Sequence, residues 1–143
     1  MAVAPVDRHD WLTENVLFLV FMLVVVFTYH IFTFSNLSYF LIFLFLILHQ
    51  IGAHYTYSQV PAGFWMQDLL GLQRNHFDRL VHFSFGFLLV YPIRELLVRL
   101  VKVEGFFSYY LPLDIVLACS GLFEIIEWLV ASIVNPELGA AYL

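Results

Sequence analysis

Four of the six histidines in this sequence lie close together between two strongly apolar regions. These are His49, His54, His76 and His82, with Asp78 among them. A later apolar segment adds two acidic residues, Glu124 and Glu127. Ionisable side chains at the depth of membrane hydrocarbon are costly and need partners, so their presence indicates a functional site. The chemistry that these residue types could perform is metal binding or proton transfer.

The spacing within this group predicts which side chains share a face. Asp78 and His82 are four residues apart, and Glu124 and Glu127 are three apart, so each pair lies on one side of a helix. His76 fits the entry of the helix that carries Asp78. The two acids fall in the second half of the last apolar segment, which returns to the membrane side where the histidines cluster. We therefore expect the two pairs to meet at compatible depths.

The first two histidines of the group fit a common centre less simply. His49 and His54 are five residues apart, which is about 140° around a helix. Both side chains reach one point only if the helix bends or ends between them. Gly52 would permit such a bend.

Imidazole and carboxylate groups together suit zinc or non-haem iron. A bound metal would activate a water molecule, and a spare carboxylate would act as general base. We therefore expect Glu124 and Glu127 to be the catalytic residues. The expected metal ligands are His49, His54, His76, Asp78 and His82. Three alternatives stay open: a metal-free polar network or proton path, plain structural contacts between spans, and a haem ligated by His49 and His82.

The composition indicates the elements that must position these residues. The chain has 143 residues, of which 62% are hydrophobic and only 12% charged, about half the charged share of an average soluble domain. No Asp, Glu, Lys or Arg occurs from Asn15 to Gln67. This pattern predicts an integral membrane protein, with membrane lipids as its surroundings. With a net charge of −5 and six Lys and Arg, it has no electrostatic basis for binding nucleic acid.

We predict an all-α polytopic bundle with about four membrane spans in a single integral membrane domain, 1–143. The expected spans are 11–34, 37–57, 77–103 and 111–134. Ser35, Asn36 and Ser38 predict a tight turn between the first two spans, and Pro112 predicts the first helical turn of the last. The connector after Pro61 and Gly63 is expected to hold a short interfacial helix. Basic residues are equally numerous on the two sides of the membrane, so the positive-inside rule does not decide the orientation.

The far end of the third span carries a second polar group. Glu95 and Arg99 are four residues apart in the order that favours a helical ion pair. Arg94 and Glu95 are expected to form either a structural pair or an internal gate, with the pair favoured.

Three stretches carry a resemblance to a known family: HQIGAHYTYSQVPAG (49–63), NHFDRLVHFSFGFLLVYPIRE (75–95) and FEIIEW (123–128). Together they resemble the YjdF-like bacterial inner-membrane proteins, small multi-pass proteins of uncharacterised function, over roughly 11–143. The resemblance implies an inner-membrane location and carries over no reaction. The family pattern usually continues with a further polar motif and more apolar spans. We therefore expect a C-terminally truncated member or a fragment.

These observations lead to one leading function and two competing ones. The leading function is a metal-dependent membrane enzyme that acts on a lipid-like substrate. The first alternative is a proton-coupled carrier that uses the same residues as a relay, with Arg94 and Glu95 lining a path to the far side. The second alternative is a non-catalytic subunit that assembles with another membrane protein.

Overall fold

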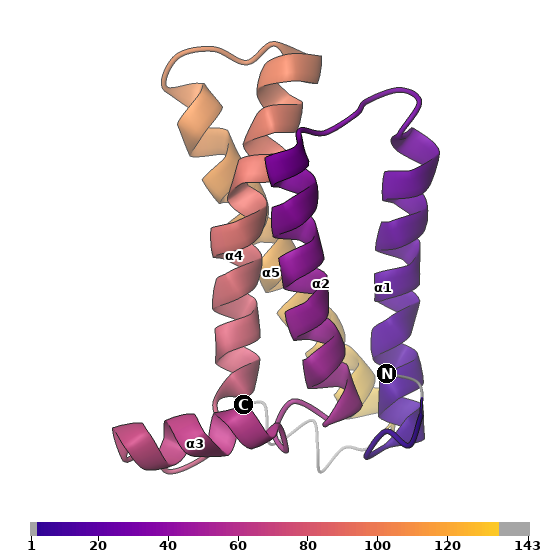
Figure 1. The fold of residues 1–143 in the computed structure, drawn as a ribbon, viewed down its shortest axis with the longest axis vertical. Helices are drawn as coiled ribbons and strands as arrows, with labels where there is room; N and C mark the ends of the chain where they lie inside the picture. The colour runs from indigo at the N-terminus through magenta and orange to yellow at the C-terminus, as the bar shows by residue number, and fades with distance from the viewer. Residues whose placement is uncertain (1–2, 135–143) are drawn as a thin grey trace.

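The computed structural model describes residues 3–134, and every regular element in that range is helical. Four long helices stand side by side, and a short one lies across one end of them (Figure 1). The elements are α1 (Arg8–Thr28), α2 (Asn36–His54), α3 (Pro61–Leu70), α4 (Phe77–Leu96), a π-helical turn (Leu97–Val101) and α5 (Phe107–Val134).

Four helices are long and apolar enough to cross a membrane: Arg8–Thr28, Asn36–His54, Phe77–Val101 and Phe107–Ile126. This finding confirms the predicted all-α, four-span fold class. The predicted short connector helix is α3, but it begins at Pro61, so Pro61 and Gly63 lie in its first turn and not before it.

The turn between the first two spans differs from the prediction. α1 ends at Thr28, and the chain then runs without helix to Ser35. The Ser35 side chain accepts a hydrogen bond from the Ser38 backbone N–H, which makes Ser35 the N-cap of α2. Because Ser35 begins a helix, Asn36 and Ser38 lie inside α2, and the expectation of a tight turn through them was wrong.

The start of the last span also differs. α5 begins at Phe107, so Pro112 lies within the helix and not in its first turn. Gly105 precedes the helix with a φ of +62°, a backbone conformation that favours glycine. The Ser108 hydroxyl donates to the Gly105 carbonyl at 2.8 Å and secures the turn from which α5 starts.

α4 lies at the centre of the packing, between α2 and α5, and α1 packs against α2. A small core forms where α2, the connector and α4 meet, around the buried side chains of Val60, Phe77 and Val81. Large apolar side chains elsewhere on the long helices point outward, as expected of a lipid-facing surface. They include Leu19, Phe43, Phe87 and Leu117.

Asn75 joins α3 to the start of α4. Its Nδ2 donates to the Val60 carbonyl at 3.0 Å, and its Oδ1 accepts from the Phe77 backbone N–H at 3.0 Å. Gly63 in α3 lies so close to the Asn75 amide that an added Cβ would overlap it. This junction fixes where α4 begins and therefore where the side chains of its first turns lie.

The opposite end of the bundle is held together by the Glu95 carboxylate. It accepts hydrogen bonds from the Ser35 backbone N–H and hydroxyl, both at 2.8 Å, and from the Ser38 hydroxyl. It also pairs with Arg99, which confirms the predicted ion pair. The carboxylate lies at the N-terminus of α2, where a negative charge is favoured by the helix dipole.

Arg94 is placed differently from its neighbour. Its guanidinium lies over the Tyr109 ring, 4.3 Å from the centroid, so it packs against α5 while Glu95 binds α2. The two residues therefore contact different helices, and the favoured Arg94–Glu95 pair was wrong. Both make structural contacts between spans.

Candidate functional site at the α3 end

His82 joins α4 to α5 through two carboxylates. Its Nε2 lies 3.2 Å from Asp78 Oδ1 and 3.4 Å from Glu124 Oε1. The carboxylate side chains are each 53% exposed, whereas the His82 side chain is 20% exposed. The predicted meeting of Asp78, His82 and Glu124 therefore occurs, and one imidazole nitrogen faces two acids.

A second hydrogen-bonded group joins α1 to α2. The Tyr57 hydroxyl lies 2.8 Å from His49 Nδ1 and 3.2 Å from Glu14 Oε2. Beside it, Gln50 Nε2 donates to Asn15 Oδ1 at 2.8 Å, which also connects the two helices. These contacts hold the first turns of α1 against the end of α2.

A backbone turn after α2 brings Tyr57 back onto the helix. Thr56 and Tyr57 both have positive φ angles, +51° and +52°, which non-glycine residues rarely adopt. The Tyr57 N–H donates to the Gly52 carbonyl at 2.8 Å. Gly52 lies directly under the Tyr57 ring, with no room for a Cβ. α2 is continuous to His54, so Gly52 serves this close approach and not the expected bend.

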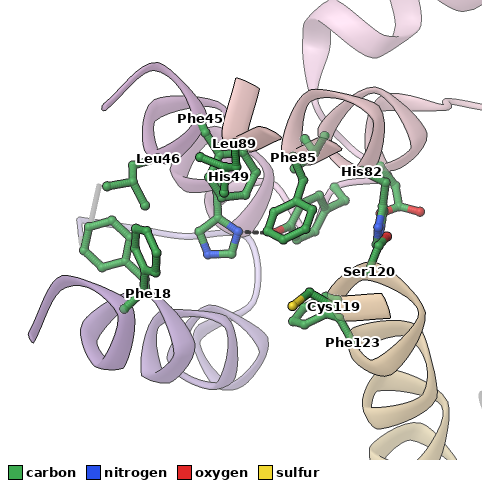
Figure 2. A pocket seen from close by; sticks show the side chains of 14 residues that line it. Phe18, Phe45, Leu46, His49, His82, Phe85, Leu89, Cys119, Ser120 and Phe123 are labelled. Carbon is green, nitrogen blue, oxygen red and sulfur yellow. Dashed lines mark hydrogen bonds and ion pairs between the residues drawn. The ribbon is translucent and has the colours of Figure 1, made fainter. Parts of the chain in front are cut away.

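The two hydrogen-bonded groups lie beside two spaces of opposite character that share part of their lining. One is an apolar cavity of about 250 Å³ between α1, α2, α4 and α5 (Figure 2). The other is a polar cleft of about 880 Å³ towards α3, lined by residues that include Asp10, Glu14, Gln67, Arg74, His76, Arg79 and Glu124. Tyr57, Asp78 and His82 line both spaces. The boundary between apolar and polar surroundings therefore runs through these three side chains.

His76 lies at the rim of the cleft, as the N-cap residue of α4. Burial lowers the pKa of its imidazole below the usual value, and the charges of Arg79 and Arg74 lower it further. The neutral form is therefore favoured at this position. Arg74 and Arg79 also give the cleft two cations opposite its carboxylates.

The predicted metal ligands do not all converge. His49 lines the apolar cavity, His76 lines the polar cleft, and His54 lines neither of the two spaces. Among the side chains that the structure describes, no three of His, Cys, Asp or Glu form a group that could hold a metal ion. The side chain of Glu127 lies outside the described part of the structure, so its catalytic role stays a prediction.

The sequence interpretation missed two acids and one tyrosine at this site. Asp10 and Glu14 are four residues apart at the start of the first span, and both line the cleft. That spacing, on the membrane side expected for the histidines, was a usable signal. No comparable sequence pattern predicted the position of Tyr57, because that position depends on the positive φ angles of Thr56 and Tyr57.

Comparisons with known proteins agree with this architecture. Residues 1–143 match a family described as "Predicted membrane protein (DUF2238)". Inner membrane protein YjdF of Escherichia coli (strain K12) is 37% identical over 123 residues, which cover 85% of this chain and 59% of the relative. The chain thus spans 59% of the length of the curated relative that it matches. No solved structure matches it.

Proposed function

The chain belongs to the DUF2238 family of predicted membrane proteins, and we propose that it binds an amphipathic, lipid-like substrate. The predicted inner-membrane location is confirmed. The apolar part of the substrate occupies the cavity between the spans, and its polar group lies in the cleft beside α3. The observation that supports this most directly is that Tyr57, Asp78 and His82 line both spaces. A molecule that fills both spaces has the boundary between its own polar and apolar parts beside these residues.

The reaction that we propose is proton transfer to or from the polar group of the substrate, by His82. An imidazole can donate or accept a proton near neutral pH. Asp78 and Glu124 both lie beside its Nε2 and can hold the imidazole in place. Arg74 and Arg79, on the rim of the cleft, provide positive charge for an anionic headgroup.

A divalent metal, zinc or iron, is the cofactor predicted from the sequence. Asp78 and Glu124 both lie beside His82 Nε2, but the described side chains do not form a group that could hold a metal ion, so the metal stays a prediction. The proton-transfer proposal does not depend on a metal. Elemental mass spectrometry on protein purified without a His tag tests the metal separately, with His82→Ala as the control.

The geometry favours a substrate site over a proton-coupled carrier. A carrier would need a polar path that continues to the far side through Arg94 and Glu95. Neither residue lines the cavity or the cleft. Both instead bind neighbouring helices. Assembly with a further membrane subunit is compatible with the exposed apolar faces and stays a prediction.

The first test asks whether a lipid occupies the cavity. Ser120 lines the cavity from α5, so Ser120→Phe fills part of it. Ala118→Phe adds the same bulk two residues away, at an exposed position outside the cavity lining. We expect mass spectrometry of protein in mild detergent to find a lipid retained by the parent and by Ala118→Phe but lost from Ser120→Phe. Equal retention by both variants would overturn the binding proposal.

The second test asks whether the bound molecule is altered. The retained lipid is returned in vesicles to the parent protein and to a His82→Gln variant. Loss of a general acid or base lowers the rate by about 10²–10⁴-fold. We therefore expect the parent to convert the lipid and His82→Gln to bind it with little conversion. If the parent protein retains the lipid but does not convert it, the chain is a binding protein and the enzyme proposal is wrong.

A further inference from the structure

The apolar cavity is covered unequally by the four helices that line it. The buried residues of its lining, His49, Val81 and Leu89, all belong to α2 and α4. None of the lining residues of α1 and α5 is buried. Phe18 of α1 is half-buried, and Cys119 of α5 is exposed. The cavity is therefore least covered on the side of α1 and α5.

α1 and α5 do not pack closely against each other over the described residues. α1 packs against α2, and α5 packs against α4. Among the described side chains, no hydrogen bond or ion pair joins α1 to α5, because the polar side chains of α1 bond instead to α2 and to the turn after it. Figure 2 shows Phe18 on one side of the cavity and Cys119 with Phe123 on the other. The two helices flank the cavity without closing it.

This less covered side lies at the depth of membrane hydrocarbon. Phe18 is the middle residue of the 21-residue span Arg8–Thr28, and Cys119 lies near the middle of α5. A span of this length crosses an apolar core of about 30 Å, so the middle of each helix lies far from water. The molecules that can reach the cavity from this side are therefore those of the bilayer itself.

The same two helices also flank the polar cleft. Glu14 lines the cleft from α1, and Glu124 lines it from α5. Each lies about one helical turn from a cavity-lining residue of its own helix, Phe18 or Ser120, towards the α3 end. A lipid that moves sideways between α1 and α5 can bring its headgroup to the cleft while its chain enters the cavity. Neither part then has to cross surroundings of the opposite polarity, which would be unfavourable.

We propose that the ligand is a lipid of the surrounding bilayer and that it enters sideways, between α1 and α5. This inference rests on the proposed function, since it concerns the same cavity and cleft. It narrows the substrate class from any amphipathic molecule to one that resides in the membrane, with a chain that reaches the depth of Phe18. The helices then differ in role, because α2 and α4 form the closed wall while α1 and α5 form the two sides of the entrance.

A reversible cross-link across this entrance tests the inference. Cys119 is the single cysteine of the chain and lies on the α5 side of the cavity. Phe21→Cys places a second thiol in the lining on the α1 side. A bis-maleimide with a reducible spacer joins the two thiols, and the intact mass of the protein establishes that the link has formed. Circular dichroism and size-exclusion profiles establish that the linked protein is folded.

The readout is exchange of the retained lipid. Linked and unlinked protein are placed in vesicles made from the total lipid extract of the expression host, grown in deuterium oxide. After extraction in mild detergent, mass spectrometry distinguishes deuterated lipid that has entered the protein from unlabelled lipid retained since purification. The total extract contains every lipid of the host membrane, so the test does not depend on which of them is the ligand.

A second cross-link is the matched control. Asn15→Cys and Gln50→Cys, in a Cys119→Ser background, place two thiols where the amide side chains are hydrogen-bonded at 2.8 Å. The same reagent then joins α1 to α2. This link restrains α1 but does not cross the space between α1 and α5.

We expect unlinked Phe21→Cys protein to acquire deuterated lipid and the linked protein to keep its unlabelled lipid. Reduction of the spacer should restore exchange, and the linked control should exchange like its own unlinked form. Exchange or release of the unlabelled lipid by linked Phe21→Cys protein would overturn the inference. The ligand would then reach the cavity by another route, such as the cleft from the water side.

The other outcomes separate this inference from the proposed function. Loss of exchange in both linked proteins would mean that any restraint on α1 stops exchange, and would overturn the entrance between α1 and α5. Failure of the two thiols in Phe21→Cys to link would show that they do not face each other across the cavity, with the same consequence. Absence of retained lipid from the parent and from both unlinked variants would contradict the proposed function as well.

Discussion

The carboxylates at the two ends of the helical bundle differ in their exposure and in their contacts. At one end the side chain of Glu95 is 8% exposed and binds the start of α2 and Arg99. At the other end Asp78 and Glu124 are each 53% exposed and share one nitrogen of His82. The closed end uses its charge to hold helices together. The open end keeps its charged groups beside a cleft, where a ligand can reach them.

The same contrast separates the two ends in their packing. The loop before α2 and the end of α4 meet through direct hydrogen bonds at Glu95. Around His49 and His82, in contrast, the four long helices surround a cavity of about 250 Å³, and a polar cleft shares part of its lining. Well-packed interiors leave few such voids. A cavity lined in part by ionisable side chains is therefore better explained by binding than by stability.

Removing the carboxylate at each end should give the largest difference between them. We expect Glu95→Ala to lower the free energy of unfolding by about 2–4 kcal/mol, because it leaves Ser35, Ser38 and Arg99 without their shared acceptor. Glu124→Ala removes an exposed ion pair and should change it by less than about 1 kcal/mol. Unfolding of both variants in mixed micelles is the measurement.

Glu95→Gln is the control for this comparison. It keeps an oxygen acceptor for the two serines but loses the charge opposite Arg99, so its stability should fall between that of the parent and Glu95→Ala. Equal destabilisation by Glu95→Ala and Glu124→Ala would show that the two ends do not differ in the way proposed here.

A smaller effect should follow from crowding the open end. In Gly52→Ala the new Cβ would overlap the Tyr57 ring, and overpacking of this kind destabilises by about 1–3 kcal/mol. Gly121→Ala is the matched control, because nothing lies within 4 Å of its Cβ. It should be stabilising by about 0.5–1 kcal/mol, since alanine favours helix more than glycine does.

Gly52→Ala should also affect His49, which Gly121→Ala should not. Displacement of the Tyr57 hydroxyl alters its hydrogen bond with His49 Nδ1. The ¹⁵N resonances of His49 should therefore change in Gly52→Ala alone. Unchanged resonances in that variant would mean that the turn at Tyr57 can absorb the extra methyl group.

Sequence patterns predicted the parts of this architecture that depend on local periodicity. The four spans, the Glu95–Arg99 pair and the shared face of Asp78 and His82 all follow from helical spacing. The contact with Glu124 also followed, because topology returns α5 to the same membrane side. Each of these depends only on a helix being present and on its direction.

The features that sequence could not predict depend on contacts between distant residues. The sequence predicted that Ser35 forms a turn. It is instead the N-cap of α2, and its hydroxyl donates a hydrogen bond to Glu95 of α4. Gly52 was read as a flexible point, and it is a contact surface for Tyr57. The convergence expected of His49 and His54 required a helix bend or end between them, and α2 is continuous through both.

The smallest predicted effect concerns the start of α1, which carries Glu14 to the open end. Asp7 is the N-cap of this helix, and its Oδ1 accepts from the backbone N–H groups of His9 at 2.7 Å and Asp10 at 3.0 Å. The N–H of Asp10, followed by that of His9, holds the pKa of Asp7 below its ordinary value of 3.8. The ionised carboxylate therefore stabilises the folded first turn.

A lowered pKa in the folded state means that this stabilisation is complete above pH 3.8, the ordinary value, and is lost as the pH falls through the lowered pKa. We expect the helical Cα chemical shifts of the first turn of α1 to decrease over that range. Asp7→Asn provides a similar cap without a titrating group, so its shifts should not follow the same curve. An identical acid transition in Asp7→Asn would mean that the change comes from other carboxylates at the open end, such as Asp10. The ionised Asp7 side chain would then not be what stabilises the first turn of α1.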